Sequence, residues 1–360
     1  MKRILITSLL TMAFFTQLGA GHAGAQQASK DQAGKDQAGK DQAASATATA
    51  PAHPVATLRR DFKDSFPIPA GEKLEYEVKL SRFPIYASLG ILTFENLGAV
   101  TIRQDSGPAA GDQQKAPAPL PTPLIDGLNT EFTPAPDEQL WRLRATAVSK
   151  GMFIALIGFD ASYRFETLVD MRDFSARANL KEMKEGKKHV IQSTLFDRAE
   201  QQVKYLTTDL SKPDAPPRAK PLPREEGMLS LLSAIYFMRL QKLKEGQMLT
   251  FPVSADEANY QFEIIVGKRQ SLKTDCGKVK TVKLEPRLFG PGRFFKIQGE
   301  MTMWVSDDNK RTPLQLVART SKGTITAKLL NFKNKCNIIE QDDEKREIDE
   351  NKGTRGKVER

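Results

Sequence analysis

Few side chains in this chain have the types and spacing that catalysis requires. His189 is the single histidine of the segment predicted to fold, because His22 lies in an N-terminal leader and His53 in a low-complexity stretch. A Ser-His-Asp or Cys-His site would have to use His189, which sits beside a lysine-rich turn where a solvated histidine is expected, and no serine lies in a nucleophile-elbow motif. No H-E-x-x-H, C-x-x-C or glycine-rich phosphate motif occurs. We therefore predict no catalytic residue, no metal and no cofactor.

Carboxylates leave a two-acid hydrolase open, because its two groups need only face each other across about 5–10 Å. The adjacent pair Asp307 and Asp308 favours another role. Neighbouring residues of an extended strand point to opposite faces, and aspartates in turns accept local backbone hydrogen bonds. The pair is followed by Arg311 and Pro313, so we predict a hairpin turn at residues 306–311.

Aromatic and cationic residues alternate in a second segment. Phe294 and Phe295 lie between Arg293 and Lys296, directly after the glycine- and proline-rich residues 290–292. Such a loop could contact a lipid or polymer surface. The alternative is a hairpin whose phenylalanines return to the core.

The cysteines number two, Cys276 and Cys336. An even pair in an exported protein is often a disulfide, which here would tie the last predicted strand to the body of the fold. Two separate thiols are the alternative, and both interpretations stay open.

The N-terminal leader indicates export. Lys2 and Arg3 precede an apolar run at residues 4–15, and small residues follow up to Ala25. This pattern is typical of a signal peptide cleaved after Ala25, and its apolar run is shorter than the about 20 residues that span a bilayer. We expect a periplasmic or secreted protein with no transmembrane segment in the mature chain.

Composition divides the remaining chain. Residues 26–65 contain the repeat Lys-Asp-Gln-Ala and little that could build a core, so they are predicted to be a disordered linker. Residues 66–339 are predicted to form a single β-rich domain with proline-rich loops at 105–136 and 211–223, and residues 340–360 a disordered charged tail. The formal net charge of +10 is compatible with envelope lipid or cell-wall polymer as partners, and the alternative is an ordinary basic surface with no such partner. Without a binding motif, nucleic acid is not expected.

The elements that would position any site are mostly strands. Leu74, Tyr76, Val78 and Leu80 alternate with charged residues, which is typical of a half-buried strand. Similar patterns recur to residue 332, and residues 151–158 fit either a buried strand or a short helix. One helix is predicted from Met228 to Leu243 with Gly246 as its C-terminal cap, and its broad apolar arc, which includes Ile235, requires burial. The predicted fold is mainly β: a strongly curved antiparallel sheet or open β-barrel with one principal buried helix.

Short motifs, in this order and spacing, resemble the exported bacterial family called domain of unknown function 3108 (DUF3108). They are Gly71–Tyr76, Phe196–Arg198, Ser233–Arg239 with Gly246, Met303–Asp308, Arg311–Leu314 and Gly323–Ile325. The resemblance covers roughly residues 68–333. It implies an envelope-localised β-rich domain and supplies no catalytic residue.

Three functions are consistent with these observations. The first is a non-enzymatic exported protein that binds an apolar or amphiphilic envelope component. A curved sheet around a helix could enclose such a ligand, and the alternative is a fully packed core with no cavity. The second is a structural or interaction module that binds cell-wall polymer or a partner protein through its basic surface. The third, a carboxylate-based hydrolase, has the least support.

Overall fold

Alternating apolar and charged residues make two-faced strands along most of the chain. In β1 (Lys73–Arg82), the predicted core residues Leu74, Tyr76, Val78 and Leu80 are all buried, and the charged residues between them are more exposed. This confirms that the period of two in the sequence marks the buried face of a sheet.

The computed structural model describes residues 54–59, 62, 68–100, 125–128, 132, 134, 138–152, 154, 158, 160–275, 277–289, 301–320 and 323–330. The predicted signal peptide, the charged tail and most of the loop predicted at 105–136 lie outside these residues. The other strands are β2 (Ile85–Val100), β3 (Leu140–Ser149), β4 (Ala161–Asp170), β5 (Ala176–Glu185), β6 (Lys188–Asp197), β7 (Gln202–Asp209), β8 (Arg218–Pro223), β9 (Met248–Ala255), β10 (Ala258–Thr274), β11 (Gly277–Phe289), β12 (Met301–Ser306), β13 (Pro313–Thr320) and β14 (Gly323–Leu329).

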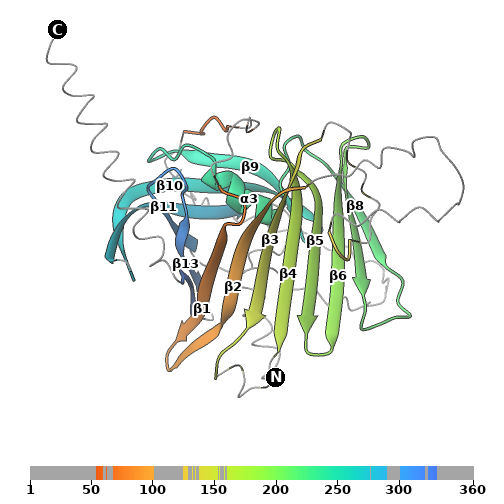
Figure 1. The fold of residues 1–360 in the computed structure, drawn as a ribbon, viewed down its shortest axis with the longest axis horizontal. Helices are drawn as coiled ribbons and strands as arrows, with labels where there is room; N and C mark the ends of the chain where they lie inside the picture. The colour runs from red at the N-terminus through yellow and green to blue at the C-terminus, as the bar shows by residue number, and fades with distance from the viewer. Residues whose placement is uncertain are drawn as a thin grey trace, which may run out of the picture.

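All these strands belong to one 14-stranded sheet in the order β8-β7-β6-β5-β4-β3-β2-β1-β14-β13-β12-β11-β10-β9. Each pair is antiparallel, and among these strands only the β1–β14 pair joins two that are distant in the sequence. Figure 1 shows that the sheet curves around helix α3 (Leu231–Arg239) and leaves β8 and β9 as its edges. The predicted class, a curved and open antiparallel sheet with one principal helix, is confirmed.

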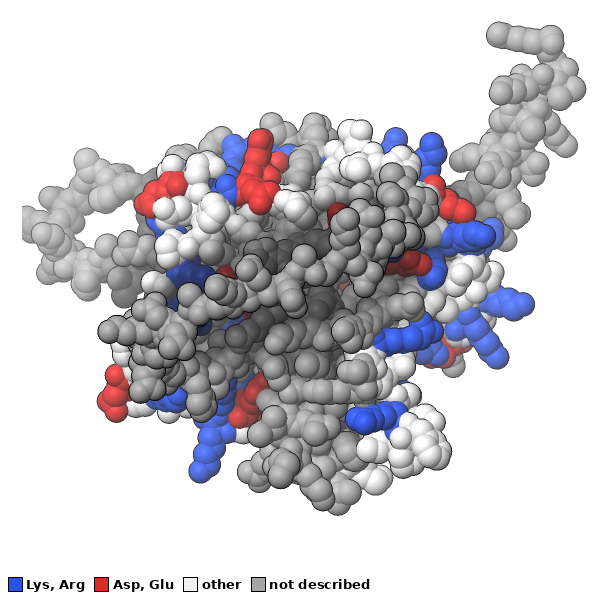
Figure 2. All heavy atoms as spheres, turned by 180° about the vertical axis from the view of Figure 1, so that it is seen from behind, with Lys and Arg blue, Asp and Glu red and all other residues white. Residues whose placement is uncertain are grey.

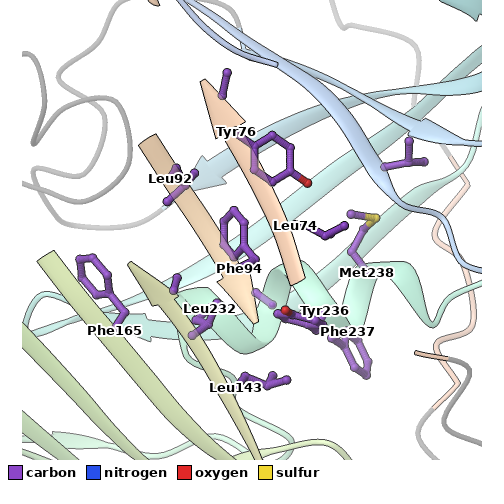
Figure 3. Packing of buried hydrophobic residues seen from close by; sticks show 14 of the residues in the cluster. Leu74, Tyr76, Leu92, Phe94, Leu143, Phe165, Leu232, Tyr236, Phe237 and Met238 are labelled. Atoms are coloured by element: carbon purple, nitrogen blue, oxygen red, sulfur yellow. The ribbon is translucent and has the colours of Figure 1, made fainter. Parts of the chain in front are cut away.

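The core fills the space between the concave side of the sheet and α3. Figure 3 shows Leu74 and Phe94 of the sheet packed toward Leu232 and Phe237 of the helix, and all four are buried. The concave side is therefore occupied by side chains in this part of the molecule.

The helix is shorter than predicted. Residues 228–230 are extended, and Leu229 forms a parallel bridge with Val253 of β9. The Ser230 side chain accepts a hydrogen bond from the Ser233 backbone N–H and so caps the first turn. At the other end Leu240 is the cap. The prediction that Gly246 caps the helix is wrong: its N–H bonds to the Val266 carbonyl, in the turn before β9.

Two further expectations need correction, and one alternative is settled. The second half of the loop predicted at 211–223 forms the edge strand β8, where proline is tolerated. The folded part also begins before the predicted boundary at residue 66, because Val55 pairs with β9 and Phe62 is buried in the core. In the segment 151–158, Met152 and Ile154 are helical, which favours the short helix over the strand.

Candidate functional site

The aspartate pair lies in the turn that the sequence predicted, between β12 and β13. The Asp308 carboxylate accepts hydrogen bonds from Ser306 Oγ at 2.8 Å, from the Lys310 N–H at 3.0 Å and from the Arg311 N–H at 2.8 Å. Asp307 accepts one from Arg269 Nε at 3.0 Å. Asp308 thus shapes the turn, and Asp307 joins it to β10.

Arg311 and Pro313 connect this turn to the rest of the fold. Arg311 has a φ of +43°, and its guanidinium donates to the Arg239 carbonyl at the end of α3 at 3.0 Å. The Pro313 carbonyl accepts a hydrogen bond from the Tyr76 hydroxyl at 2.8 Å. The turn therefore holds the C-terminal end of the helix against the sheet.

Several predicted residues lie outside the described part of the chain. They are the surface-contact residues Arg293, Phe294, Phe295 and Lys296, and the cysteines Cys276 and Cys336. The predictions made for them stay predictions.

His189 is partly exposed at the start of β6. Its Nε2 lies 2.9 Å from Glu182 Oε1. Burial by itself would raise the pKa of Glu182, but hydrogen bonds from Lys184, His189 and Arg164 lower it to about 2. The histidine is therefore paired with a carboxylate in a charged surface cluster, as expected for a solvated histidine near a turn.

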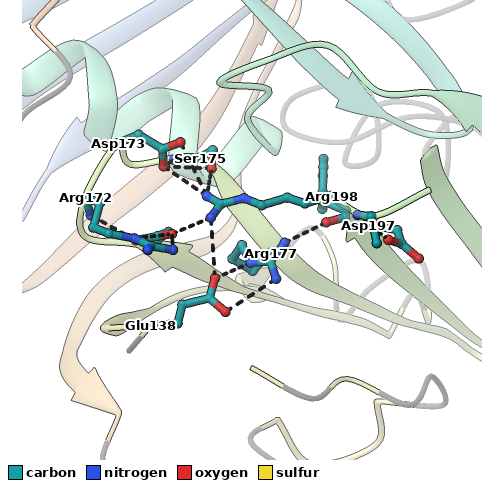
Figure 4. Close-up of polar contacts among 10 residues, drawn as sticks. Glu138, Arg172, Asp173, Ser175, Arg177, Asp197 and Arg198 are labelled. Atoms are coloured by element: carbon teal, nitrogen blue, oxygen red, sulfur yellow. Dashed lines mark hydrogen bonds and ion pairs between the residues drawn. The ribbon is translucent and has the colours of Figure 1, made fainter. Parts of the chain in front are cut away.

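A network of ion pairs joins the β4–β5 turn to the end of β6 (Figure 4). Asp170 accepts hydrogen bonds from Arg172 Nη2 at 2.8 Å and from Arg198 Nη1 at 2.7 Å, and Arg198 also donates to Ser175 Oγ at 2.7 Å. Burial by itself would raise the pKa of Asp170, but the hydrogen bonds from Arg172 and Arg198 together have the larger effect, so the pKa lies below its usual value. Arg198, one of the motif residues, thus positions a turn.

The same network extends to the segment that precedes β3. Arg177 forms an ion pair with the buried Glu138 and donates to the Phe196 carbonyl at 2.9 Å. Arg177 and Arg198 of this network bond to groups on other segments. They therefore hold together the segment before β3, the β4–β5 turn and the end of β6. Across the described ranges, no group of three or more His, Cys, Asp or Glu residues has a geometry that could hold a metal ion.

Polar side chains of β5, β6 and β8 contact the turn between β9 and β10. Asp256 and Glu257, both at positive φ, form the β9–β10 turn. Glu257 Oε1 accepts from Arg218 Nη2 of β8 at 2.5 Å and from Gln192 Nε2 at 3.2 Å. Asp256 forms an ion pair with Lys181 of β5, and burial raises the pKa of Asp256 more than Lys181 lowers it.

A small pocket lies beneath this turn. Its walls include Lys181, Asp256, Gln192 and the apolar Phe165 and Leu232, and its volume is about 30 Å³. This is room for about two water molecules, whereas pockets for drug-sized ligands measure about 300–1,000 Å³. The pocket is therefore too small to enclose an amphiphile.

Apolar side chains project into solvent at the tip of the β1–β2 hairpin. Phe83 is 87% exposed and Tyr86 72% exposed, and Pro84 and Ile85 lie between them. Met152, in the connection after β3, is 89% exposed. We call Phe83, Pro84, Ile85 and Tyr86 the hairpin tip. Hydrophobic residues are normally scattered singly over a surface, so a group of them indicates a contact.

One cation adjoins the hairpin tip. Arg82 directly precedes Phe83 and is exposed. Lys150, also exposed, lies further along β2, where its N–H bonds to the Leu89 carbonyl. Figure 2, seen from behind, shows uncharged atoms gathered with Lys or Arg side chains at the lower right, where the hairpin projects. Sequence reasoning missed this site, although the signal was present: two aromatic residues around a proline in a turn, where polar residues are usual.

Comparisons with known proteins give a family and two distant folds. A model of the family described as "Protein of unknown function (DUF3108)" matches residues 128–330. A solved β-barrel-like protein of domain of unknown function DUF1849 from Brucella abortus is 10% identical with a TM-score of 0.41, over 72% of this chain and 96% of that chain. A putative exported protein with a YmcC-like fold from Bacteroides fragilis is 9% identical with a TM-score of 0.27, over 75% and 98%.

A comparison with curated proteins gives no match. In the described segments, no helix has the length and apolar character needed to cross a bilayer.

Proposed function

The chain belongs to the DUF3108 family, as its motifs predicted, and because that family carries no assigned function we propose one: an exported, non-enzymatic envelope protein that binds a lipid surface through the hairpin tip. Export is supported by the leader at residues 1–25. The observation that carries the proposal is the exposure of Phe83 and Tyr86 beside Arg82.

Physical chemistry favours a lipid surface for such a tip. Transfer of an exposed phenylalanine out of water contributes about 1.5–3 kcal/mol, and each lysine or arginine near an anionic lipid surface adds about 1 kcal/mol. Tyrosine is suited to the bilayer interface because its ring is apolar and its hydroxyl is polar. The tip therefore combines an apolar contact with the adjoining cation Arg82, which matches an anionic amphiphilic surface.

The non-enzymatic part of the proposal is supported by the contacts that the described carboxylates make. The Asp307–Asp308 pair shapes a turn, and the carboxylates of the β4–β5 network are neutralised by arginines. The hydrolase that the sequence left open would need two acids facing a cleft, and these groups are already used to hold the fold.

The test is co-sedimentation with vesicles of phosphatidylglycerol and phosphatidylcholine. The double variant Phe83→Ser/Tyr86→Ser removes both aromatic rings. If insertion uses half of the available burial, it loses about 2 kcal/mol, or roughly thirtyfold in partitioning. The matched control is Leu210→Ser, which replaces an exposed apolar residue after β7, far along the sheet from the tip.

Two results would contradict the proposal. One is equal vesicle binding by the wild type and the double variant, and the other is no vesicle binding by the wild type. Sedimentation with purified cell-wall polymer in place of vesicles would favour the interaction module as the function.

A further inference from the structure

A short N-terminal segment lies across the edge strand β9. We call Pro54–Arg59 together with Phe62 the strap. The Ala56 N–H donates to the Met248 carbonyl at 2.8 Å, and the Met248 N–H donates to the Pro54 carbonyl at 3.0 Å. The strap thus adds to the sheet as a parallel bridge at Val55, which is how extended peptides bind to sheet edges in many complexes.

Gln241, which follows α3, holds the strap a second time. Its side-chain Oε1 accepts from the Arg59 N–H at 2.7 Å, and its Nε2 donates to the Arg59 carbonyl at 3.0 Å. Gln241 is buried, so its amide needs other polar partners if the strap is displaced.

Phe62 fills an aromatic site between α3 and the β4–β5 turn. It is 1% exposed, and its ring meets Phe174 edge-on with centroids 5.7 Å apart and Phe237 with centroids 6.2 Å apart. The edge-to-face series continues from Phe237 to Phe251 at 5.3 Å. On its core side the ring therefore has apolar neighbours that continue along the concave side of the sheet, and on the other side the Arg59 guanidinium lies 5.3 Å from its centroid.

The rest of the strap lies at the edge of the sheet. Pro54, Val55, Thr57 and Arg59 are exposed, whereas Ala56 and Leu58 are partly buried against the core. Segments with few buried apolar contacts open locally at a lower free energy than the core. The strap has one fully buried ring and two partly buried side chains to release, so we expect Phe62 to leave its site without unfolding of the sheet.

We propose that the site filled by Phe62 binds the apolar chain of a single-chain amphiphile, and that the strap is its built-in occupant. Apolar cavities in proteins stay dry and take apolar ligands, and the amide of Gln241 would bond to the polar head group in place of Arg59. The inference rests on the proposed function, because it supplies a site for the apolar part of an amphiphile that the hairpin tip contacts at the surface.

The experiment is a fluorescence titration with 11-(dansylamino)undecanoic acid. Phe62→Ala vacates the site, so its affinity for the probe should exceed that of the wild type by about tenfold or more, because a minor open state reduces the apparent affinity by its population. The matched control, Phe94→Ala, removes an equally large buried ring elsewhere in the core and should bind like the wild type. Equal affinities of these two variants would overturn the inference.

A second variant keeps the aromatic core intact. Ala56→Pro removes the N–H that bonds to Met248, so it should loosen the strap and tighten probe binding; wild-type affinity here would contradict the inference. Probe binding to the wild type should also increase hydrogen exchange at Met248, and unchanged exchange at saturating probe would refute displacement of the strap.

The same titration separates this inference from the proposed function. The double variant Phe83→Ser/Tyr86→Ser should bind the probe like the wild type while it loses vesicle binding. If vesicle binding fails in the wild type but Phe62→Ala still gains affinity for the probe, the surface proposal falls and the internal site stands. If vesicle binding holds and Phe62→Ala gains nothing, the internal site falls alone.

Discussion

Replacing Glu72 by Gln tests the most deeply buried ion pair described in this fold. Arg239 Nη1 lies 2.6 Å from Glu72 Oε2 and Nη2 lies 2.9 Å from Oε1, and the two side chains are 1% and 5% exposed. Arg239 ends α3 and also donates to the Lys310 carbonyl at 3.1 Å. The pair therefore joins the helix to the start of β1 and to the β12–β13 turn.

The magnitude follows from burial. Burial alone would lower the pKa of Arg239, but the hydrogen bonds and charge of Glu72 raise it, so the guanidinium stays charged. Glu72→Gln keeps the shape and removes the compensating charge, which costs about 3–5 kcal/mol for a buried pair. For a domain of this size, each kcal/mol lowers Tm by about 2–4 °C.

Urea unfolding at pH 7, followed by tryptophan fluorescence, measures this loss. The matched control is Glu75→Gln in β1, whose partly exposed pair with Lys73 at 3.2 Å should contribute about 0–1 kcal/mol. An apolar double replacement, Glu72→Leu/Arg239→Met, should recover much of the stability lost by the single variant. A Glu72→Gln variant as stable as Glu75→Gln would refute the reasoning.

Two further predictions concern the sheet. Gly90→Ala should cost about 1–3 kcal/mol, because a Cβ there would lie 2.2 Å from the Val148 carbonyl oxygen, whereas Gly267→Ala, with its nearest atom at 3.2 Å, should cost less; equal urea midpoints would contradict this. Burial would raise the pKa of Glu182, but hydrogen bonds lower it from 4.5 to about 2, so its contribution to stability is full above pH 4.5 and is lost as pH falls toward 2. The urea midpoints of Glu182→Gln and the wild type should therefore differ at pH 7 and converge near pH 2, and a constant difference would contradict this.

Strand positions were the most predictable part of the fold, because each face of the sheet has its own environment. β1 buries the four residues that its alternation selects, Leu74, Tyr76, Val78 and Leu80. Alternation is a local property, so a sequence displays it directly. The pairing of β1 with β14, which brings the ends of the fold together, has no local signal.

The ends of the helix depend on tertiary contacts. Met228 and Leu229 fit the apolar arc of a helix, yet Leu229 bonds to β9, because its N–H donates to the Pro252 carbonyl at 3.0 Å. Ile235 was expected to be buried but is only partly so, whereas Leu232 is 2% exposed. A broad apolar arc does not specify which of its residues face the sheet. The neighbouring strands decide this.

Functional residues were harder to predict than elements. The turn at Asp308 was predictable, because aspartate side chains bond to nearby backbone N–H groups. The hairpin tip was not predicted, because alternation identifies the buried face of a strand. Phe83 lies in the turn between β1 and β2, where alternation gives no signal. The strap was assigned to the linker, because Phe62 is an isolated aromatic residue in a polar stretch.

An open sheet must protect two edges, and this requirement links the strap to the rest of the fold. β9 is covered by Val55 at one end and by Leu229 near the other, so strap displacement would expose backbone groups that can pair with another chain. Ligand entry that releases the strap from Met248 therefore exposes part of this edge. The Phe62→Ala and Ala56→Pro variants separate the contribution of the ring site from that of the Val55 bridge.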